Sequence, residues 1–364
     1  MINPLRIVID GRMYQQSGIG RYIRNLITHL QILDKENEYF ILHCKEDFNS
    51  LKYQNNFHKI LADFPWYGVK EQIRLPQMLD SVKPNLVHFP HFNVPFFYNG
   101  KFVVTIHDLI HQHFSMERAT THGPIIYKIK QAGYKIVLKN ALSKSSKILV
   151  PSNFVKGQLT ENWKISGEKI VVTPEAVDDR LPGTKATKKF DFPFIFYVGN
   201  AHPHKNVEGL IKAYLILKEK YKTLKLVLAG ADHYFWQKIK KEYSYQDIIY
   251  TGKISDEELV AMYRNAAAFV LPSFEEGFGI PILEAMACGC PVVSSNAGSL
   301  PEIGRDACLY FDPFDTNNMV EKISEILDDE KLRLRLIEKG LKRHKSFSWK
   351  TLAQKTLEVY RQCV

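Results

Sequence analysis

Residues 268–294 have the sequence AFVLPSFEEGFGIPILEAMACGCPVVS, and this stretch contains the structural pattern that recurs along the chain. Its first apolar run, at 268–272, predicts a buried strand. The residues that follow predict a helix, because Pro281 suits the first helical turn and Gly289 suits a left-handed end. A second apolar run at 291–294 predicts the next strand. This order of strand, helix and strand is typical of a parallel sheet covered by helices.

Apolar runs of the same kind occur from one end of the chain to the other. They predict strands at 6–10, 39–43, 86–89, 102–107, 147–151 and 169–173 in the first half, and at 194–199, 225–229, 248–252, 268–272, 291–294 and 308–311 in the second. The runs lack a strict alternation of apolar and polar residues, as expected of strands that are buried on both faces. The fold class is therefore predicted to be α/β, with two doubly wound, Rossmann-like domains.

A polar stretch at 178–189 contains Pro and Gly and predicts a linker between the domains, with the boundary near residue 185. The predicted domains are then 1–184 and 185–346, and a length of 364 residues suffices for two cores of ordinary size. Open α/β sheets bind ligands beyond the carboxyl ends of their strands. We therefore expect two sheets that face each other across a ligand-binding cleft.

The composition is that of a globular protein that folds in water, with 45% hydrophobic and 24% charged residues. The net charge of +10 favours an anionic partner such as a nucleotide, a phosphate, a nucleic acid or a lipid headgroup. The five Cys residues have neither disulfide-framework nor zinc-site spacing, which predicts a reducing, cytoplasmic setting. The chain start lacks the features of a signal peptide, and no apolar run approaches the roughly 18 residues of a membrane span. Any membrane contact is therefore predicted to be peripheral, on the inner face of the plasma membrane.

Two glutamates and a glycine-rich loop follow the strand predicted at 268–272. Glu276 precedes the predicted helix and Glu284 lies inside it, so the two carboxylates would meet two parts of one ligand. The loop between them, Gly277-Phe278-Gly279-Ile280, leaves backbone N–H groups at a helix N-terminus, where a diphosphate is favoured. The alternative interpretation is a glycine turn before an exposed helix whose acidic side chains are only solvated.

The whole string PSxxEGFGxxxLEAMAxGxPVVxSxxGxxPE at 272–302 resembles the signature of the family 4 retaining glycosyltransferases, which have the two-domain GT-B fold. The resemblance implies that the C-terminal domain holds a nucleotide-sugar donor. It implies that Glu284 binds the ribose, that Glu276 and the amides from Phe278 to Ile280 meet the sugar and phosphates, and that Gly230 and Lys253 lie near the base.

Two segments of the first half bear the same resemblance. The loop Gly18-Ile19-Gly20 follows the first strand, where this family places a glycine-rich loop against the donor phosphate. Without the resemblance it would be only a glycine turn, because the full dinucleotide-binding fingerprint is missing. His107 ends a predicted strand, where such enzymes place a histidine near the donor sugar. A single histidine is otherwise more often a structural residue.

The segment 197–206, YVGNAHPHKN, resembles the element that carries the family's basic phosphate clamp. The resemblance implies that Asn200, His204 and Lys205 bind the donor, with Lys205 at the start of a helix. Many members have Arg where Asn200 stands, and relatives with Asn there often have Arg at the place of His204. The clamp is therefore predicted to depend chiefly on Lys205. The residues 347–364 resemble the C-terminal helix that returns to the N-terminal domain in GT-B enzymes.

These features together predict a retaining glycosyltransferase that moves a hexose from a nucleotide diphosphate sugar to a hydroxyl of a glycan or lipid-linked acceptor, in cell-surface polysaccharide synthesis. UDP-glucose and GDP-mannose are both compatible with the sequence, and UDP-glucose is slightly favoured only because uridine donors are the commoner type. No Asp-x-Asp metal site is evident, so neither a metal nor another cofactor is expected. A sugar-nucleotide epimerase or a phosphorylase of the same fold is the alternative. A nucleic-acid-binding protein, suggested only by the pI of about 9.1, lacks a recognisable binding motif.

A basic stretch at 125–147 contains six lysines and no acidic residue: Lys128, Lys130, Lys135, Lys139, Lys144 and Lys147. One interpretation is a solvated face above a packed apolar face formed by Ile125, Ile129, Ala132, Ile136 and Leu142. The other is a surface that docks on an anionic membrane.

Overall fold

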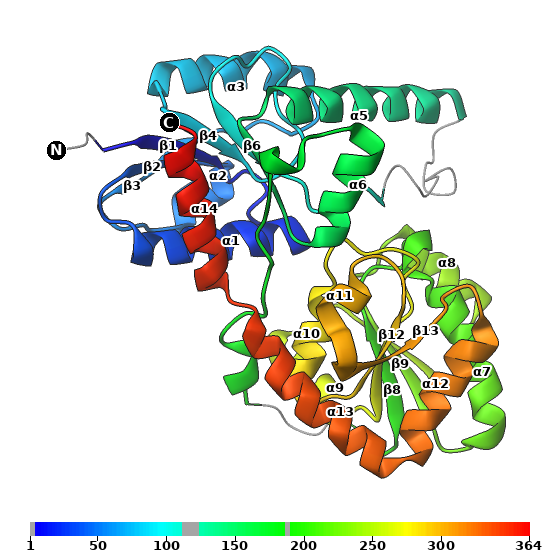
Figure 1. Ribbon diagram of the computed structural model, residues 1–364. Helices are drawn as coiled ribbons and strands as arrows, with labels where there is room; N and C mark the ends of the chain where they lie inside the picture. Colours follow the sequence, from blue (N-terminus) through cyan, green and yellow to red (C-terminus); the bar gives the residue numbers. More distant parts are fainter. Residues whose placement is uncertain (1–3, 111–123, 186–189) are drawn as a thin grey trace. The chain divides into compact units, whose positions relative to one another are not determined.

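The computed structural model describes residues 4–110, 124–185 and 190–364, with the backbone alone at Ser17 and at 124–130. These residues form two compact units, each built around a parallel sheet (Figure 1). The predicted α/β class with two Rossmann-like units is confirmed. No helix in these described parts of the chain is long and apolar enough to span a bilayer.

The first unit contains a seven-stranded sheet in the order β3-β2-β1-β4-β5-β6-β7. Its strands are β1 (Arg6–Asp10), β2 (Glu38–His43), β3 (Phe57–Leu61), β4 (Leu86–Phe89), β5 (Phe102–Thr105), β6 (Lys147–Val150) and β7 (Ile170–Val172). Its helices are α1 (Ser17–Leu33), α2 (Lys45–Ser50), α3 (Val69–Val82), α5 (Pro124–Lys144), α6 (Asn153–Trp163) and α14 (Trp349–Gln362). Helices α1 and α14 lie on one face of this sheet, and α3 and α5 lie on the other (Figure 1).

The C-terminal helix α14 is part of the first unit although its sequence follows the second. It packs against α1 and buries Trp349 completely. The Tyr360 hydroxyl lies 2.6 Å from Nδ1 of His88 on β4, and Nε2 of His88 lies 2.8 Å from the Thr105 hydroxyl. Burial lowers the pKa of His88 to about 3, and the nearby His107 adds to this effect. A neutral histidine therefore joins α14 to the centre of the sheet.

The second unit contains a six-stranded sheet in the order β10-β9-β8-β11-β12-β13. Its strands are β8 (Phe194–Val198), β9 (Lys225–Ala229), β10 (Ile248–Gly252), β11 (Ala268–Leu271), β12 (Val292–Ser295) and β13 (Cys308–Phe311). Its helices are α7 (Val207–Lys220), α8 (Tyr234–Glu242), α9 (Asp256–Asn265), α10 (Ile280–Ala287), α11 (Leu300–Gly304), α12 (Thr316–Asp328) and α13 (Glu330–Arg343). Helices α7 and α12 lie on one face, and α9 and α10 lie on the other (Figure 1).

The strand β3 is missing from the sequence prediction. Its sequence FHKIL contains His58 and Lys59, because it forms an edge of the sheet and does not need the continuous apolar run of a central strand. All twelve predicted strands are present, with ends that differ by at most two residues. The chain enters the second unit after Glu175, and Val177 and Leu181 pack in the core of that unit. The polar stretch at 178–189 thus begins inside the second unit.

The apolar face predicted for α5 is wrong at two of the three positions whose side chains the structure describes. Ala132 and Ile136 are exposed, whereas Leu142 is buried as predicted, together with Leu138 and Ala141. The buried stripe thus coincides with the predicted one only at Leu142. The side chains of Ile125, Lys128, Ile129 and Lys130 lie outside the described part.

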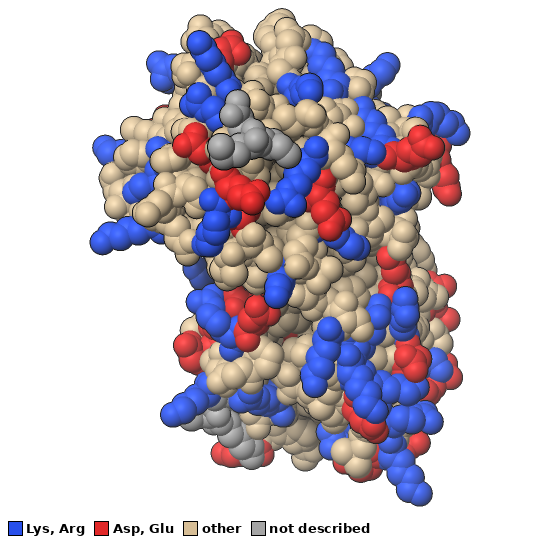
Figure 2. All heavy atoms as spheres, turned by 60° about the vertical axis from the view of Figure 1, so that its left-hand side comes forward, with Lys and Arg blue, Asp and Glu red and all other residues tan. Residues whose placement is uncertain are grey.

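Charged side chains of both signs are mixed on the face of the molecule in Figure 2. Acidic side chains lie next to the basic ones over much of this face. Proteins that bind a nucleic-acid backbone gather Lys and Arg on one face or along one helix. This face therefore does not have the charge pattern of a nucleic-acid interface.

Candidate functional site

An ion pair between Lys205 and Glu276 is the centre of the candidate site in the second unit. Lys205 follows β8, and Glu276 follows β11, the neighbouring strand. The Lys205 ammonium lies 2.6 and 2.8 Å from the two carboxylate oxygens of Glu276, and the Ser273 hydroxyl donates to Oε1 at 2.6 Å. The exposed fractions of the two charged side chains are 17% and 10%. The structure thus brings together two residues to which the sequence analysis assigned separate tasks, Lys205 in the phosphate clamp and Glu276 beside the sugar and phosphates.

The predicted position of Lys205 at the start of a helix is wrong by two residues. Lys205 is the last residue of a 3-10 helix of one turn, Pro203–Lys205. Helix α7 begins at Val207, after Asn206, whose backbone is left-handed with a φ of 53°. The side chain of Asn206 donates to the carbonyls of Pro272 and Pro313 at 3.2 and 3.0 Å. These two hydrogen bonds hold the turn that carries Lys205 against the loops after β11 and β13.

The loop Gly277-Phe278-Gly279-Ile280 leads directly into α10. Gly279 has a φ of +97°, and no side chain caps the first turn of α10. Ser299 donates to the carbonyls of Glu276 and Phe278 at 3.0 and 2.9 Å, which holds the loop in place. α10 thus begins with an uncapped N-terminus, and backbone N–H groups in such a position suit an anionic ligand.

Glu284 lies within α10 and is almost completely buried, with an exposed fraction of 3%. The Tyr263 hydroxyl of α9 donates to its Oε2 at 3.1 Å. A carboxylate on a buried helical face, held by a phenol, is a fixed acceptor for ligand hydroxyl groups. The interpretation of Glu284 as a solvated surface acid is therefore wrong.

Asn200, His204, Gly230 and Lys253 lie at the carboxyl edge of the same sheet. Tyr197 donates to the Asn200 carbonyl at 2.6 Å, and the His204 carbonyl accepts the N–H of Phe274 at 2.7 Å. A Cβ atom at Gly230 would lie 2.1 Å from the Gly199 carbonyl oxygen, so only glycine fits between these loops. Lys253 is exposed after β10. The predicted donor residues of the second unit thus come from four adjacent strands, β8 to β11.

The predicted site residues of the first unit are Gly18, Gly20 and His107. A Cβ atom at Gly20 would lie 2.3 Å from the Tyr14 carbonyl oxygen, whereas one at Gly18 would meet open space. Position 20 therefore requires glycine, because the Tyr14 carbonyl of the preceding turn lies too close for a larger residue. The glycine at position 18 leaves open space beside the start of α1.

His107 contacts a hydrogen-bond acceptor with each ring nitrogen. Nδ1 lies 2.9 Å from Oε1 of Glu175, and Nε2 lies 2.9 Å from the carbonyl oxygen of Pro90. Burial disfavours the charged imidazole, but the Glu175 carboxylate and the Pro90 carbonyl outweigh it, and the pKa of His107 is raised. The protonated imidazole is thus favoured more at His107, between the loops after β4 and β7, than at an ordinary histidine.

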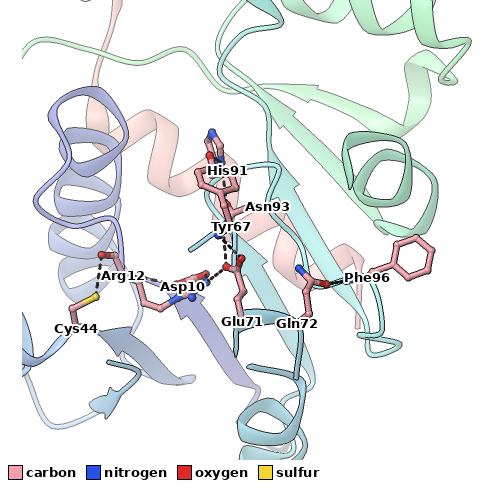
Figure 3. Close-up of polar contacts among 9 residues, drawn as sticks. All are labelled: Asp10, Arg12, Cys44, Tyr67, Glu71, Gln72, His91, Asn93 and Phe96. Atoms are coloured by element: carbon pink, nitrogen blue, oxygen red, sulfur yellow. Dashed lines mark hydrogen bonds and ion pairs between the residues drawn. The ribbon is translucent and has the colours of Figure 1, made fainter. Parts of the chain in front are cut away.

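Glu175 was missed by the sequence analysis, and so was a buried cluster at the end of β1 (Figure 3). In that cluster Arg12 donates to Asp10 at 2.8 and 2.6 Å and to Glu71 at 2.5 Å, and Asn93 donates to Glu71 at 2.9 Å. Burial raises the pKa of Glu71, although the Arg12 guanidinium opposes this shift. Asp10 ends β1, Asn93 follows β4 and Glu175 follows β7, so the rule that ligands bind beyond carboxyl ends could have found them.

The described parts of the chain contain no group of three or more His, Cys, Asp or Glu side chains arranged to hold a metal ion. The independence of the activity from a metal ion stays a prediction.

The sequence matches two family models that together span most of the chain. Residues 184–343 match the family described as glycosyl transferases group 1, and residues 16–181 match glycosyltransferase family 4. The chain belongs to the group 1, family 4 type of glycosyltransferase. The two Rossmann-like units of this glycosyltransferase are those of the GT-B fold.

Three individual likenesses accompany this assignment. The O-antigen chain mannosyltransferase B of Escherichia coli is 29% identical over 96% of this glycosyltransferase and 97% of that protein. The uncharacterized glycosyltransferase MJ1178 of Methanocaldococcus jannaschii is 30% identical over 70% of this chain and 75% of that protein. The crystal structure of Anabaena Alr3699/HepE in complex with UDP-glucose has a TM-score of 0.76 and 15% identity, and the match covers 98% of this chain and all of that one.

Proposed function

We propose that this glycosyltransferase is a retaining enzyme that transfers a hexose from a nucleotide diphosphate sugar to a hydroxyl group of a glycan acceptor. The observation that carries this proposal is the Lys205–Glu276 pair beside the uncapped start of α10. An ammonium group has three N–H donors, and Glu276 offers two oxygens to them. Lys205 can therefore bind a phosphate oxygen while it still contacts Glu276.

The transfer breaks the bond between the anomeric carbon and the phosphate oxygen of the donor. The acceptor oxygen bonds to the anomeric carbon on the face that the phosphate leaves, and the acceptor proton leaves with the nucleotide diphosphate. Negative charge grows on the diphosphate while positive charge grows on the sugar ring. Lys205 and the N–H groups of Phe278 to Ile280 would stabilise the first, and Glu276 would stabilise the second.

For the donor we propose a mannosyl nucleotide, with GDP-mannose as the first candidate. The full-length likeness to an O-antigen chain mannosyltransferase supports mannose, whereas UDP-glucose was favoured only because uridine donors are the commoner type. The same likeness supports a cell-surface glycan as acceptor. The UDP-glucose complex of the HepE structure supports the general class of nucleotide diphosphate sugar donors.

The test measures nucleotide diphosphate release from GDP-mannose and from UDP-glucose, with and without a soluble mannoside acceptor. The wild type should release GDP with the acceptor present. Lys205→Ala should bind nucleotide about 10- to 100-fold more weakly, as expected when a charge-assisted hydrogen bond is lost. Lys241→Ala, at an exposed lysine of α8, is the matched control and should behave like the wild type. A sugar-nucleotide epimerase would release no nucleotide diphosphate, and a phosphorylase would require inorganic phosphate.

A second proposal concerns the membrane as a partner, and it depends on exposed apolar residues of the first unit. Val69 and Ile73 of α3, Phe97 of the loop after β4, and Ile136 of α5 are between 55% and 76% exposed. Hydrogen bonds join these elements, because the N–H of Phe96 donates to Gln72 and the ammonium of Lys144 donates to the Phe96 carbonyl. The Phe96 ring points away from the polar side chains of Glu71 and Gln72 (Figure 3).

The helices α3 and α5 that carry three of these apolar side chains also carry exposed basic residues. Lys70, Arg74, Lys135, Lys139 and Lys144 are exposed, and the segments 69–74, 94–97 and 131–144 have no exposed acidic side chain. Apolar side chains flanked by Lys and Arg favour binding to an anionic bilayer surface. We propose that this surface docks the enzyme on anionic lipid.

Flotation with vesicles of phosphatidylglycerol and phosphatidylcholine tests the membrane proposal. The wild type should float with anionic vesicles at low salt and remain unbound at high salt. Lys135→Glu, Lys139→Glu and Lys144→Glu together should abolish flotation. A control with Lys241→Glu, Lys331→Glu and Lys345→Glu has the same net charge and should float. Equal flotation of the two triple variants, or no flotation of the wild type, would contradict the proposal.

A further inference from the structure

A cavity of about 380 Å³ lies in the second unit, next to the candidate site but with its own lining. The residues at the start of α7, in α8 and in the loops after β11 and β13 enclose it. Its volume lies at the lower end of the range of about 300–1,000 Å³ found for small-molecule sites. Lys205, Glu276 and Glu284 do not line it. The cavity is therefore an additional place for a ligand.

Aromatic rings form two walls of this cavity. On one wall the rings of His202 and Phe235 have centroids 4.9 Å apart. On the other, Phe274 and Phe314 stack at 4.8 Å with an interplanar angle of 23°. Phe314 is nevertheless 76% exposed. The Phe314 ring therefore presents an accessible face on which a ligand in the cavity can stack.

The Phe314 wall is fixed before any ligand binds. The Asp312 carboxylate accepts the N–H of Phe314 at 2.9 Å, and Asn206 holds the carbonyls of Pro272 and Pro313. The two loops that carry Phe274 and Phe314 are thus tied to the start of α7. Such preorganisation lowers the entropic cost of ligand binding.

The lining of the cavity contains charges of both signs. Glu208 and Lys238 lie 4.0 Å apart, and Lys212 and Thr316 also line the cavity. Carboxylate oxygens accept hydrogen bonds, ammonium groups donate them, and a sugar hydroxyl does both. Glu208 would repel a phosphate, whereas Lys212 and Lys238 would attract one, so these charges alone do not select the ligand. Stacking faces together with donors and acceptors of both kinds suit a saccharide.

We propose that this cavity is a second carbohydrate site, which binds a hexose unit of the glycan by stacking on Phe314 and Phe235. The proposal rests on the proposed glycosyltransferase function, because it assigns part of the acceptor glycan to the donor unit. Asn206 and Phe274, which line the cavity, are one and two residues away from Lys205 and Glu276 in the sequence. The same loops thus position the bound hexose and the charged pair.

Calorimetric titration with α-linked mannotetraose and with maltotetraose tests the second site. At least one of these saccharides should bind the wild type. Phe314→Ala should weaken that binding about tenfold, since an aromatic contact is worth about one decade of affinity. Lys212→Ala, which removes one donor from the lining, should also weaken it. Tyr245→Ala removes another exposed aromatic side chain of the same unit, outside the cavity, and should leave binding unchanged.

Three outcomes would overturn the inference. The first is that neither saccharide binds the wild type, and the second is that Phe314→Ala binds the saccharide as tightly as the wild type does. The third is that Phe314→Ala loses affinity for GDP and UDP as strongly as for the saccharide, which would make the cavity part of the nucleotide site. Nucleotide diphosphate release by the same preparations is measured in parallel. Its absence would contradict the proposed function, whereas a saccharide that binds at Phe314 would still support the second site.

Discussion

Replacing Lys205 by Met tests whether the ion pair with Glu276 stabilises the second unit. The substitution removes the ammonium, keeps an apolar stem of similar length, and leaves the Glu276 carboxylate without its cation. Removing one partner of a buried pair costs about 3–5 kcal/mol, whereas exposed pairs contribute about 0–1 kcal/mol. The exposed fractions of 17% and 10% place this pair near the buried limit, and the Ser273 hydroxyl still donates to the carboxylate. We therefore expect a loss of about 2–3 kcal/mol.

Thermal unfolding followed by circular dichroism at pH 7.5 measures this loss. For a domain of this size, 2–3 kcal/mol corresponds to a decrease in Tm of roughly 4–12 °C. The double variant Lys205→Met, Glu276→Gln has no buried charge and should recover most of the decrease. If Lys205→Met unfolds at the wild-type temperature, or if the effects of the two single substitutions simply add, the pair does not form and the site geometry is wrong.

Glu284→Gln should weaken nucleotide binding in a thermal-shift titration while turnover at saturating donor changes little, and a loss confined to turnover would contradict its assignment to the ribose. Activity with a nucleotide sugar should survive excess EDTA, and a complete loss that Mn²⁺ restores would show a metal site. Because the pKa of His107 is raised, its pairing with Glu175 stabilises the fold below the ordinary histidine pKa, and this contribution is lost as the pH rises through the folded value. In urea unfolding, the wild type should therefore exceed His107→Gln by more at pH 6 than at pH 8.5, and equal differences would contradict the pairing. Tyr360→Phe leaves Nδ1 of the buried His88 without its partner and should lower the unfolding free energy by about 1–3 kcal/mol, so an unchanged value would show that this hydrogen bond is not made.

Sequence patterns predicted most of the fold because its central strands are buried on both faces. Such strands need continuous apolar runs, and the runs at β1 and β8 were visible for that reason. The edge strand β3 contains His58 and Lys59 and was missed. The packed face of α5 was misplaced at Ile136, because a helix with lysines on several sides has two possible apolar stripes. Only the packing against the sheet selects one.

The candidate site was predicted residue by residue, but its contacts were not. The sequence analysis identified Lys205 and Glu276, and it gave no reason to expect that they contact each other. Glu175 was missed because its only signal was a position after a short strand. His107 gains its raised pKa from that residue, which is distant in sequence. Contacts of this kind arise when parallel strands end at the same edge of a sheet.

The anomeric configuration of the product tests the central claim most directly. The enzyme is incubated with GDP-α-mannose and with UDP-α-glucose in the presence of octyl α-mannoside, and the glycoside formed is examined by proton and carbon NMR. A retaining hexosyltransferase gives an α-linked disaccharide and an equal amount of nucleotide diphosphate from at least one donor. A β-linked product would contradict retention, and a sugar nucleotide that is consumed without release of nucleotide diphosphate would contradict the proposed transfer itself.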